Sequence, residues 1–322
     1  MAQSATPDSS VSFRRASQPS LKLQQLSGAR RLQYWRERFI ELLLFFAAFS
    51  SVAITLGIVG TLVYESATFF RHVSIIDFFT DTLWTPLFAN PHFGILPLVT
   101  GTLVTTVVAL AVALPIGTIA SIYLSEFAPP VVRETIKPAL ELLSAVPTVV
   151  YGYFALLFVA PLLQKIIPGL PTFNMLSAGI VMGIMIIPYV SSLSEDAMRA
   201  VPMSLREGSY AMGANKIITA LKVVYPAAFS GIVSSYILAI SRAIGETMIV
   251  AIAAGMQPNL TLDPTQPAAT ITAFIVQVSL GDLPHGSIGY QSIFAAGLIL
   301  FLMTLFFNIV GYVLRKRFRE VY

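Results

Sequence analysis

Long apolar stretches without a single charge dominate the pattern of hydrophobic and polar positions along this chain. An α-helix needs about 20 apolar residues to cross the hydrocarbon core of a bilayer. Asp, Glu, Lys and Arg are absent from five stretches of at least that length: 42–64, 82–125, 142–164, 166–194 and 286–314. The pattern predicts an all-α polytopic membrane protein with six transmembrane helices, at 39–64, 95–124, 140–163, 174–194, 229–255 and 290–314.

The composition agrees with a membrane location. The chain is 56% hydrophobic and 11% charged, whereas a soluble domain carries about 25% charged residues. It contains no cysteine, which excludes disulfides, metal thiolates and thiol nucleophiles. We therefore expect the lipid bilayer to be the chain's main surroundings. We also expect this chain to bind no metal and to carry no catalytic residues.

The distribution of Lys and Arg predicts the orientation. With the N-terminus inside, the cytoplasmic segments hold seventeen of these residues and the external loops hold two. A cytoplasmic excess of Lys and Arg orients membrane spans, so both termini are predicted to be cytoplasmic. The same placement explains the net charge of +4 without a nucleic-acid partner.

Four regions follow from these boundaries. Residues 1–38 are predicted to form a polar, partly disordered cytoplasmic tail, and 39–94 the first span with an external loop. Residues 95–314 form the main transmembrane domain, and 315–322 a basic cytoplasmic tail.

Two charges interrupt the fifth predicted span. Arg242 lies near its middle, and Glu246 follows four residues later. In a continuous helix both lie on one face, so Glu246 can accept hydrogen bonds from Arg242. An ionised group at this depth costs about 2.5–3.5 kcal/mol on insertion scales. The pair is either a structural ion pair or an anion site on a pathway, and intramembrane charges favour the pathway.

A row of small residues runs beside this pair. These residues recur every four positions, a spacing that lets another helix approach closely. Their positions are Gly231, Ser235, Ala239, Ala243, Thr247, Ala251 and Gly255. The fifth span is therefore predicted to pack tightly against a neighbour while its charged face lines a protein interior or a water-filled passage.

The segment between the fourth and fifth spans carries a recognisable motif. Glu207, Gly213 and Pro226 have the spacing of the EAA loop of ABC importer permeases, which this segment resembles. Gly208 and Ser209 replace the two alanines of that pattern, so the positions stay small. We expect residues 204–217 to form a short surface helix that fits a groove on a soluble partner. An ordinary connecting helix is the alternative.

Three further stretches extend the resemblance over about residues 39–320. They are WTPLFANPHFGILPLVTGTL at 84–103, LSAVPTVVYGYF at 143–154 and SRAIGET at 241–247. Together they resemble the phosphate ABC importer permeases of the PstC type.

The resemblance implies a type I ABC importer permease fold in the cell inner membrane. It also implies three kinds of partner: a second, PstA-like permease, an ATPase dimer, and an extracytoplasmic phosphate-binding protein. ATP and Mg²⁺ would be used by the ATPase, with no cofactor on this chain. In that family, the residues matching Arg242 and Glu246 are implicated in phosphate passage.

Other function classes remain as alternatives. A permease for another oxyanion, such as sulfate, molybdate or phosphonate, would have the same fold. A channel or secondary transporter would need no ATPase partner. An intramembrane enzyme is disfavoured, because no pair of carboxylates lies within the predicted spans. The chain has no Gly-Lys dipeptide and hence no phosphate-binding loop, so ATP hydrolysis would have to come from a partner.

Overall fold

The computed structural model describes residues 20–281, 283–284 and 286–317, with side-chain surroundings from Gln33 onward. The predicted all-α class is confirmed, since the only β pairing among these residues is one bridge between Trp84 and Phe93.

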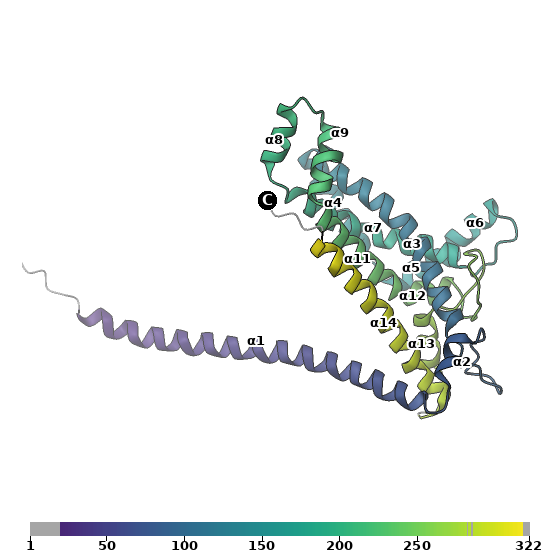
Figure 1. Cartoon of the computed structure of the whole chain (residues 1–322). Coiled ribbons are helices and arrows are strands. Elements are labelled where there is room, and N and C mark those ends of the chain that lie inside the picture. Colours follow the sequence, from purple (N-terminus) through teal and green to yellow (C-terminus); the bar gives the residue numbers. More distant parts are fainter. Residues whose placement is uncertain (1–19, 282, 285, 318–322) are drawn as a thin grey trace, which may run out of the picture. The chain divides into compact units, whose positions relative to one another are not determined.

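Two units are distinguished, Met1–Gly60 and Thr61–Tyr322. In chain order the helices (Figure 1) are α1 (Ser20–Phe69), α2 (Ile75–Thr80), α3 (Leu96–Ile122), α4 (Pro130–Ala145), α5 (Thr148–Phe154), α6 (Ala160–Ile166), α7 (Met175–Arg199), α8 (Met203–Ala211), α9 (Lys216–Thr219), α10 (Tyr225–Ala227), α11 (Phe229–Ile244), α12 (Met248–Ala253), α13 (Ile271–Ser279) and α14 (Ile288–Arg317).

The first unit holds most of α1. This helix begins at Ser20, well before the expected start of the first span at 39, so the later part of the polar segment is helical. Residues 33–58 are exposed, including a long series of Phe, Leu and Ile side chains. A helix that is apolar on all sides suits a hydrocarbon environment. The rest of the predicted tail, 1–19, and residues 318–322 lie outside the described residues.

The second unit contains four of the five long apolar helices. The five are Gln33–Phe69, Leu96–Phe127, Thr148–Ile166, Met175–Arg199 and Ile288–Arg317. The prediction for the third span, 140–163, was wrong at its start. Val146 and Pro147 are extended and separate α4 from the span, because proline lacks an amide donor and disfavours a helical residue before it. The amphipathic α4, which has no fully buried residue, precedes this break.

The fifth predicted span, 229–255, is also not one helix. Its first part, α11, is joined to the preceding helical segment Lys216–Ala227 at an angle of 71°. Its second part separates as α12 after a break that begins at Gly245. If the bent pair of Lys216–Ala227 and α11 is counted as one span, it is the sixth candidate span, and the short helix α12 follows it.

Three π-helical segments each come shortly before a proline. They are Tyr123–Phe127, Ala155–Val159 and Ala220–Val224, and each ends two residues before a proline: Pro129, Pro161 and Pro226. In an α-helix the proline ring clashes with the carbonyl four residues earlier, which here lies within each segment. The backbone widens instead, as in the bond from the Ala128 amide to the Tyr123 carbonyl at 2.8 Å.

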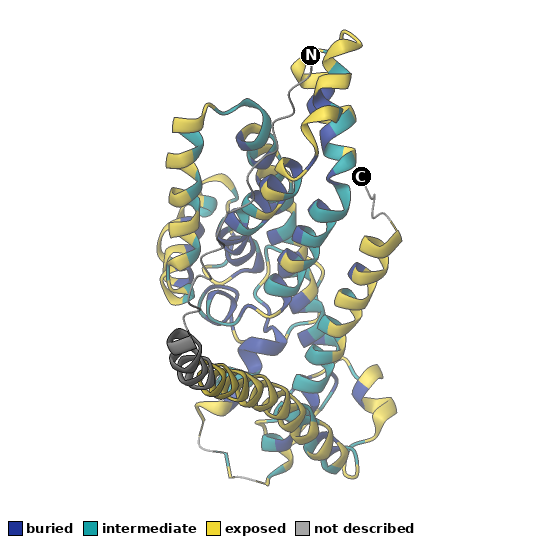
Figure 2. Ribbon diagram, turned by 90° about the vertical axis from the view of Figure 1, so that its left-hand side faces the viewer, coloured by how far each residue is buried: buried dark blue, intermediate teal, exposed yellow. Residues whose placement is uncertain are grey.

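The core of the second unit lies where α3 packs on α7, and α7 has more buried residues than any other described helix. Buried stretches are dark blue in Figure 2. Glycines permit this contact. A Cβ atom on Gly183 would lie 2.7 Å from the Ala109 carbonyl oxygen, and one on Gly117 would lie 2.7 Å from Cβ of Val190. Such close backbone approach is typical of helix pairs in membranes. It makes α7 the rigid support on which the neighbouring helices are placed.

An aromatic cluster closes the end of this unit opposite α8 and α9. Trp84 packs edge-on against Phe274 of α13 at 5.0 Å between ring centroids, and against Phe78 at 6.2 Å. Phe69 and Phe93 extend the cluster. Aromatic pairs at these distances contribute beyond the area they bury, so the cluster holds α13 in the core.

Candidate functional site

Arg242 lies in the last turn of α11, where α7 provides its surroundings. The guanidinium carbon is 4.8 Å from the ring centroid of Tyr189, and Nη2 is 4.0 Å from Sδ of Met185. Nε is buried and has no hydrogen-bond partner among the described residues. An aromatic face attracts a cation, but neither ring nor thioether is a strong acceptor. The guanidinium therefore retains unused donors.

The predicted ion pair between Arg242 and Glu246 is wrong. The prediction assumed a continuous helix, but α11 ends at Ile244 and the helix resumes only at Met248. The Glu246 carboxylate accepts hydrogen bonds from the amides of Met248 at 3.1 Å and Ile249 at 3.5 Å. These amides have no partner within a helix, so the carboxylate caps the start of α12. No ion pair joins the two side chains, both of which the structure describes.

The break between α11 and α12 is held by α13. The Thr272 hydroxyl donates to the Glu246 carbonyl oxygen at 2.6 Å. Both residues are buried, so neither bond of Glu246 competes with bulk water. The interruption beside Arg242 is therefore held from two sides. The Glu246 side chain binds the first amides of α12, and the Glu246 carbonyl oxygen accepts a hydrogen bond from α13.

The first four members of the predicted row of small residues, which lie on α11, pack against α7. Thr247, Ala251 and Gly255 lie beyond the break at Gly245, so the row does not continue on one helix as predicted. A Cβ atom on Gly231 would clash with Cβ of Ala197. Further along α11, the Ser235 and Ser194 hydroxyls are 2.8 Å apart and hydrogen-bonded. Ala239 and Ala243 continue the row and are buried. The row thus brings α11 close to α7 over its whole length and places Arg242 beside Tyr189.

The segment predicted as one helix over 204–217 is two short helices. α8 ends at Ala211, and α9 begins only at Lys216. Gly213 makes the turn between them with φ +84°, a left-handed conformation that favours glycine. The Ser209 and Thr219 hydroxyls are 2.8 Å apart and link the two helices.

The other motif residues lie on the surface of this segment. Glu207 and Gly208 are exposed, and a Cβ atom on Gly208 would meet nothing within 4 Å. Contacts within this chain therefore do not explain why position 208 is small. Pro226 is exposed in α10, directly after a π-helical segment and before the 71° bend.

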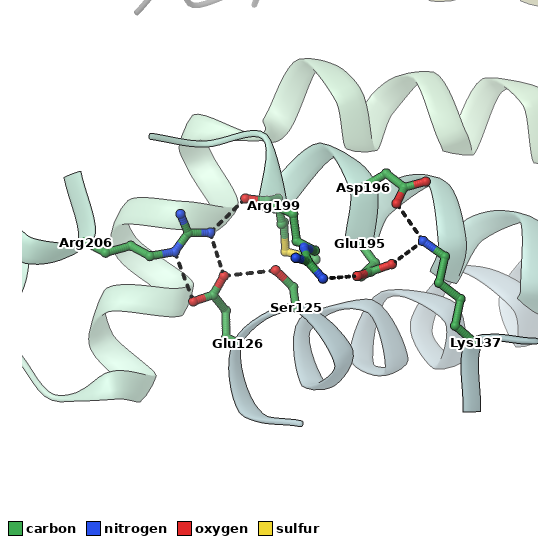
Figure 3. A network of polar contacts seen from close by, with 8 residues as sticks. Ser125, Glu126, Lys137, Glu195, Asp196, Arg199 and Arg206 are labelled. Carbon is green, nitrogen blue, oxygen red and sulfur yellow. Dashed lines mark hydrogen bonds and ion pairs between the residues drawn. The ribbon is translucent and has the colours of Figure 1, made fainter. Parts of the chain in front are cut away.

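Arg206, which precedes the motif glutamate, is the buried member of α8. Its guanidinium donates to Glu126 through Nη2 at 2.9 Å and Nε at 3.3 Å. It also donates to the carbonyl oxygen of Met198, in the last turn of α7, at 2.8 Å, and to that of Val201, just beyond the helix, at 2.7 Å. Ser125 donates to the same carboxylate at 2.9 Å. One side chain therefore connects α8 with the ends of α3 and α7 (Figure 3).

A second polar cluster joins α4 to α7 nearby (Figure 3). Nζ of Lys137 donates to Glu195, which is 1% exposed, and to Asp196, both at 2.6 Å. Burial lowers the pKa of Lys137, but the bonds to Asp196 and Glu195 outweigh it and raise the pKa above its usual value. Arg199 adds a longer contact of 3.6 Å to Glu195. The buried carboxylate is therefore matched by two cations.

Sequence reasoning did not identify these two clusters. Glu126 is the first charge after the uncharged stretch 82–125, and Arg206 directly precedes the motif glutamate. These positions mark ends of elements, but a separation of 80 residues leaves no local signal that the two side chains meet.

Comparison with known proteins gives a consistent result. Residues 113–320 match the family described as binding-protein-dependent transport system inner membrane component. The chain is 33% identical to the probable ABC transporter permease protein YqgH of Bacillus subtilis (strain 168), over 85% of this chain and 88% of that protein. It is also 33% identical to the phosphate transport system permease protein PstC of Mesorhizobium japonicum, over 74% of this chain and 78% of that protein.

A solved structure extends the comparison to the fold. A bacterial ABC transporter involved in the import of the acidic polysaccharide alginate has a chain that superposes with a TM-score of 0.62. The identity is 13%, and the match covers 89% of this chain and 100% of the other. A chain of the MetNI methionine ABC transporter superposes with a TM-score of 0.52 at 16% identity, over 70% of this chain and 95% of that chain. These similarities support the fold alone.

Proposed function

The chain belongs to the family of binding-protein-dependent transport system inner membrane components, and we propose that it is the permease subunit of an ATP-driven phosphate importer, forming half of the translocation pathway. The observation that carries this proposal is the guanidinium of Arg242. It lies in an apolar helix, beside a fixed break, and has no carboxylate partner among the described residues. A guanidinium can donate two parallel hydrogen bonds to an oxyanion.

The likeness to PstC proteins supports phosphate as the oxyanion. Arg242 would meet the anion during its passage, and Tyr189 would hold the guanidinium in place without neutralising it. Glu246 would act as a positioning residue, because its carboxylate fixes the start of α12 and with it the break beside Arg242. Keeping this carboxylate bound to amides leaves the positive charge of Arg242 available to the anion.

The partners follow from the same proposal. The α8–α9 segment would dock on an ATPase dimer that hydrolyses ATP with Mg²⁺, a second, PstA-like permease would complete the pathway, and an extracytoplasmic protein would deliver phosphate. The exposed apolar side chains of Met203, Met212 and Ile217 support docking on this segment. The free space at Gly208 supports close approach of another protein there. The excess of Lys and Arg supports a cytoplasmic position for this segment and for both termini.

Uptake of radiolabelled phosphate and sulfate tests the pathway role. Vesicles would contain the whole complex with Arg242 intact, with Arg242→Gln and with Arg242→Lys. We expect Arg242→Gln to lower phosphate uptake at least about 100-fold, because it removes charge-assisted hydrogen bonds of about 1.5–3 kcal/mol each. Arg242→Lys should retain part of the uptake, since it keeps the charge but loses the planar fork. The ATPase should still co-purify with every variant.

Two results would contradict the proposal. Normal phosphate uptake by Arg242→Gln would mean that the residue is structural. Faster uptake of sulfate than phosphate by the intact complex would assign the chain to another oxyanion.

Docking of the ATPase is tested separately with Gly208→Leu. The new side chain meets nothing in this chain, and leucine favours a helix more than glycine does, so the thermal stability of the purified permease should not fall. Co-purification of the ATPase should be lost, because the added bulk would occupy the contact. Retention of the ATPase at unchanged yield would remove the α8–α9 segment from the proposed interface.

A further inference from the structure

A hollow opens between the first turns of α11 and the last turns of α14. It consists of two contiguous parts with volumes of about 400 and 440 Å³, which share Gly231, Ser234, Tyr312 and Arg315. The close approach of α14 to α11 forms one side, where a Cβ atom on Gly311 would clash with the Ile237 side chain. We call this space the α11–α14 hollow.

The lining of the α11–α14 hollow is chemically divided. Leu193, Ile237 and Leu238 form an apolar wall. Arg315 lines both parts, and Lys316 and Ser230 line the second part. No Asp or Glu lines either part, and no carboxylate in the described part of the chain lies within ion-pair distance of the two cations. The hollow therefore favours an occupant that is anionic at one end and apolar at the other.

Polar groups at the boundary add hydrogen-bonding capacity. The Ser234 hydroxyl donates to the Ser230 carbonyl oxygen at 2.9 Å, which leaves its oxygen free to accept. Nδ2 of Asn308 donates to the Thr304 carbonyl oxygen at 2.8 Å and keeps a second N–H. Both residues line the part of the hollow that also holds the apolar wall.

The cations lie where a bilayer changes from hydrocarbon to headgroups. The uncharged stretch of α14 ends at Leu314, and Arg315 and Lys316 follow directly in its last turn. Leu238 and Tyr312 are exposed beside them. Basic pockets between transmembrane helices at this level bind anionic lipid headgroups.

We propose that the α11–α14 hollow binds the headgroup of an anionic phospholipid, with its phosphate at Arg315 and Lys316. An acyl chain of the lipid lies along Leu193 and Leu238. Hydroxyls of a glycerol headgroup donate to Ser234. This site is separate from Arg242 and does not depend on what the chain transports.

Native mass spectrometry of the purified full chain, together with the subunits that co-purify with it, tests this site. Phosphatidylglycerol is titrated against the wild type, Arg315→Gln and Arg317→Gln. Arg317 is the matched control, because it belongs to the same basic turn but does not line the hollow. We expect Arg315→Gln to weaken binding about fivefold, consistent with the loss of one cation near an anionic surface. Arg317→Gln should change it less than twofold.

A second variant tests the space instead of the charge. Ser234→Leu fills the hollow while keeping both cations, and it should also weaken phosphatidylglycerol binding. Its thermal stability in phosphatidylcholine verifies that it is folded. Phosphatidylcholine itself should bind at least about fivefold more weakly than phosphatidylglycerol to the wild type.

Three outcomes would overturn the proposal. Equal losses in Arg315→Gln and Arg317→Gln would mean an unspecific attraction to a basic helix end. Displacement of the lipid by millimolar inorganic phosphate would assign the cations to free phosphate. Because the chain has no native cysteine, Ser234→Cys can be probed with a membrane-permeant maleimide. Protection of this thiol in every lipid would show that another protein segment covers the hollow.

Discussion

Replacing Arg206 with methionine should destabilise the membrane domain strongly, because it leaves the buried Glu126 carboxylate without its cation. The side chains of Arg206 and Glu126 are only 10% and 5% exposed, and Arg206 makes four hydrogen bonds. Removing one member of such a pair leaves an uncompensated buried charge and costs about 3–5 kcal/mol. For a domain of this size, that corresponds to a decrease of about 6–10 °C in melting temperature.

The assay is thermal unfolding of the purified full chain in one detergent at fixed pH. Arg199→Met is the control, because Arg199 is 44% exposed and lies 3.6 Å from its carboxylate. Its loss should cost less than about 1 kcal/mol. The double variant Arg206→Met/Glu126→Leu should be more stable than Arg206→Met alone, since replacing both members of a buried pair with apolar residues is often close to neutral.

Two results would refute this reasoning. Equal shifts for Arg206→Met and Arg199→Met would mean that burial does not strengthen the Arg206 contacts. Additive losses from Arg206→Met and Glu126→Leu would mean that the two side chains are not energetically coupled.

Three further predictions concern other parts of the fold. Gly183→Leu should destabilise the α3–α7 contact by about 1–3 kcal/mol, measured by thermal unfolding, while Gly208→Leu, which has free space inside α8, should not unfold at a lower temperature than the wild type. Gly213→Ala should lower stability by about 1 kcal/mol, because φ is +84° there, and an unchanged melting temperature would count against that geometry. The hydrogen bonds from His92 and from the Leu83 amide lower the pKa of Asp81 below 3.8. The stability that the ionised Asp81 carboxylate contributes is therefore present above pH 3.8 and is lost as pH falls through the lowered pKa. Fluorescence of Trp84 in a Trp35→Phe background should report this loss, and Asp81→Asn should abolish its pH dependence.

Hydropathy predicted the spans because uncharged stretches directly reflect the thickness of the bilayer. Hydropathy did not predict where the helices break, because the presence of a proline or glycine alone does not decide whether a helix is interrupted. Pro115 and Pro188 lie inside continuous helices, whereas Pro147 separates two. The bend at Ala228 and the interruption at Gly245 likewise depend on packing and on hydrogen bonds from distant residues, which a local pattern cannot contain.

The candidate site was predictable in part. Arg242 was identifiable because a charge in an apolar stretch is costly, but its surroundings were not. Pairing with Glu246 required a continuous helix, whereas the observed contacts come from Met185 and Tyr189, more than fifty positions away. The motif around Glu207 was visible from spacing, while its connection to α3 through Arg206 depends on the tertiary fold.

The π-helical segments make the membrane domain adjustable at defined points. Each takes up one extra residue in a widened turn whose backbone hydrogen bond spans five residues instead of four. In Ala220–Val224 this widened turn comes directly before Pro226 and the 71° bend into α11. Deleting one residue there would leave the proline in place, and its ring would still clash with the carbonyl four residues earlier in an α-helix. The length of the chain at these three points therefore helps to set the direction in which the following segment continues.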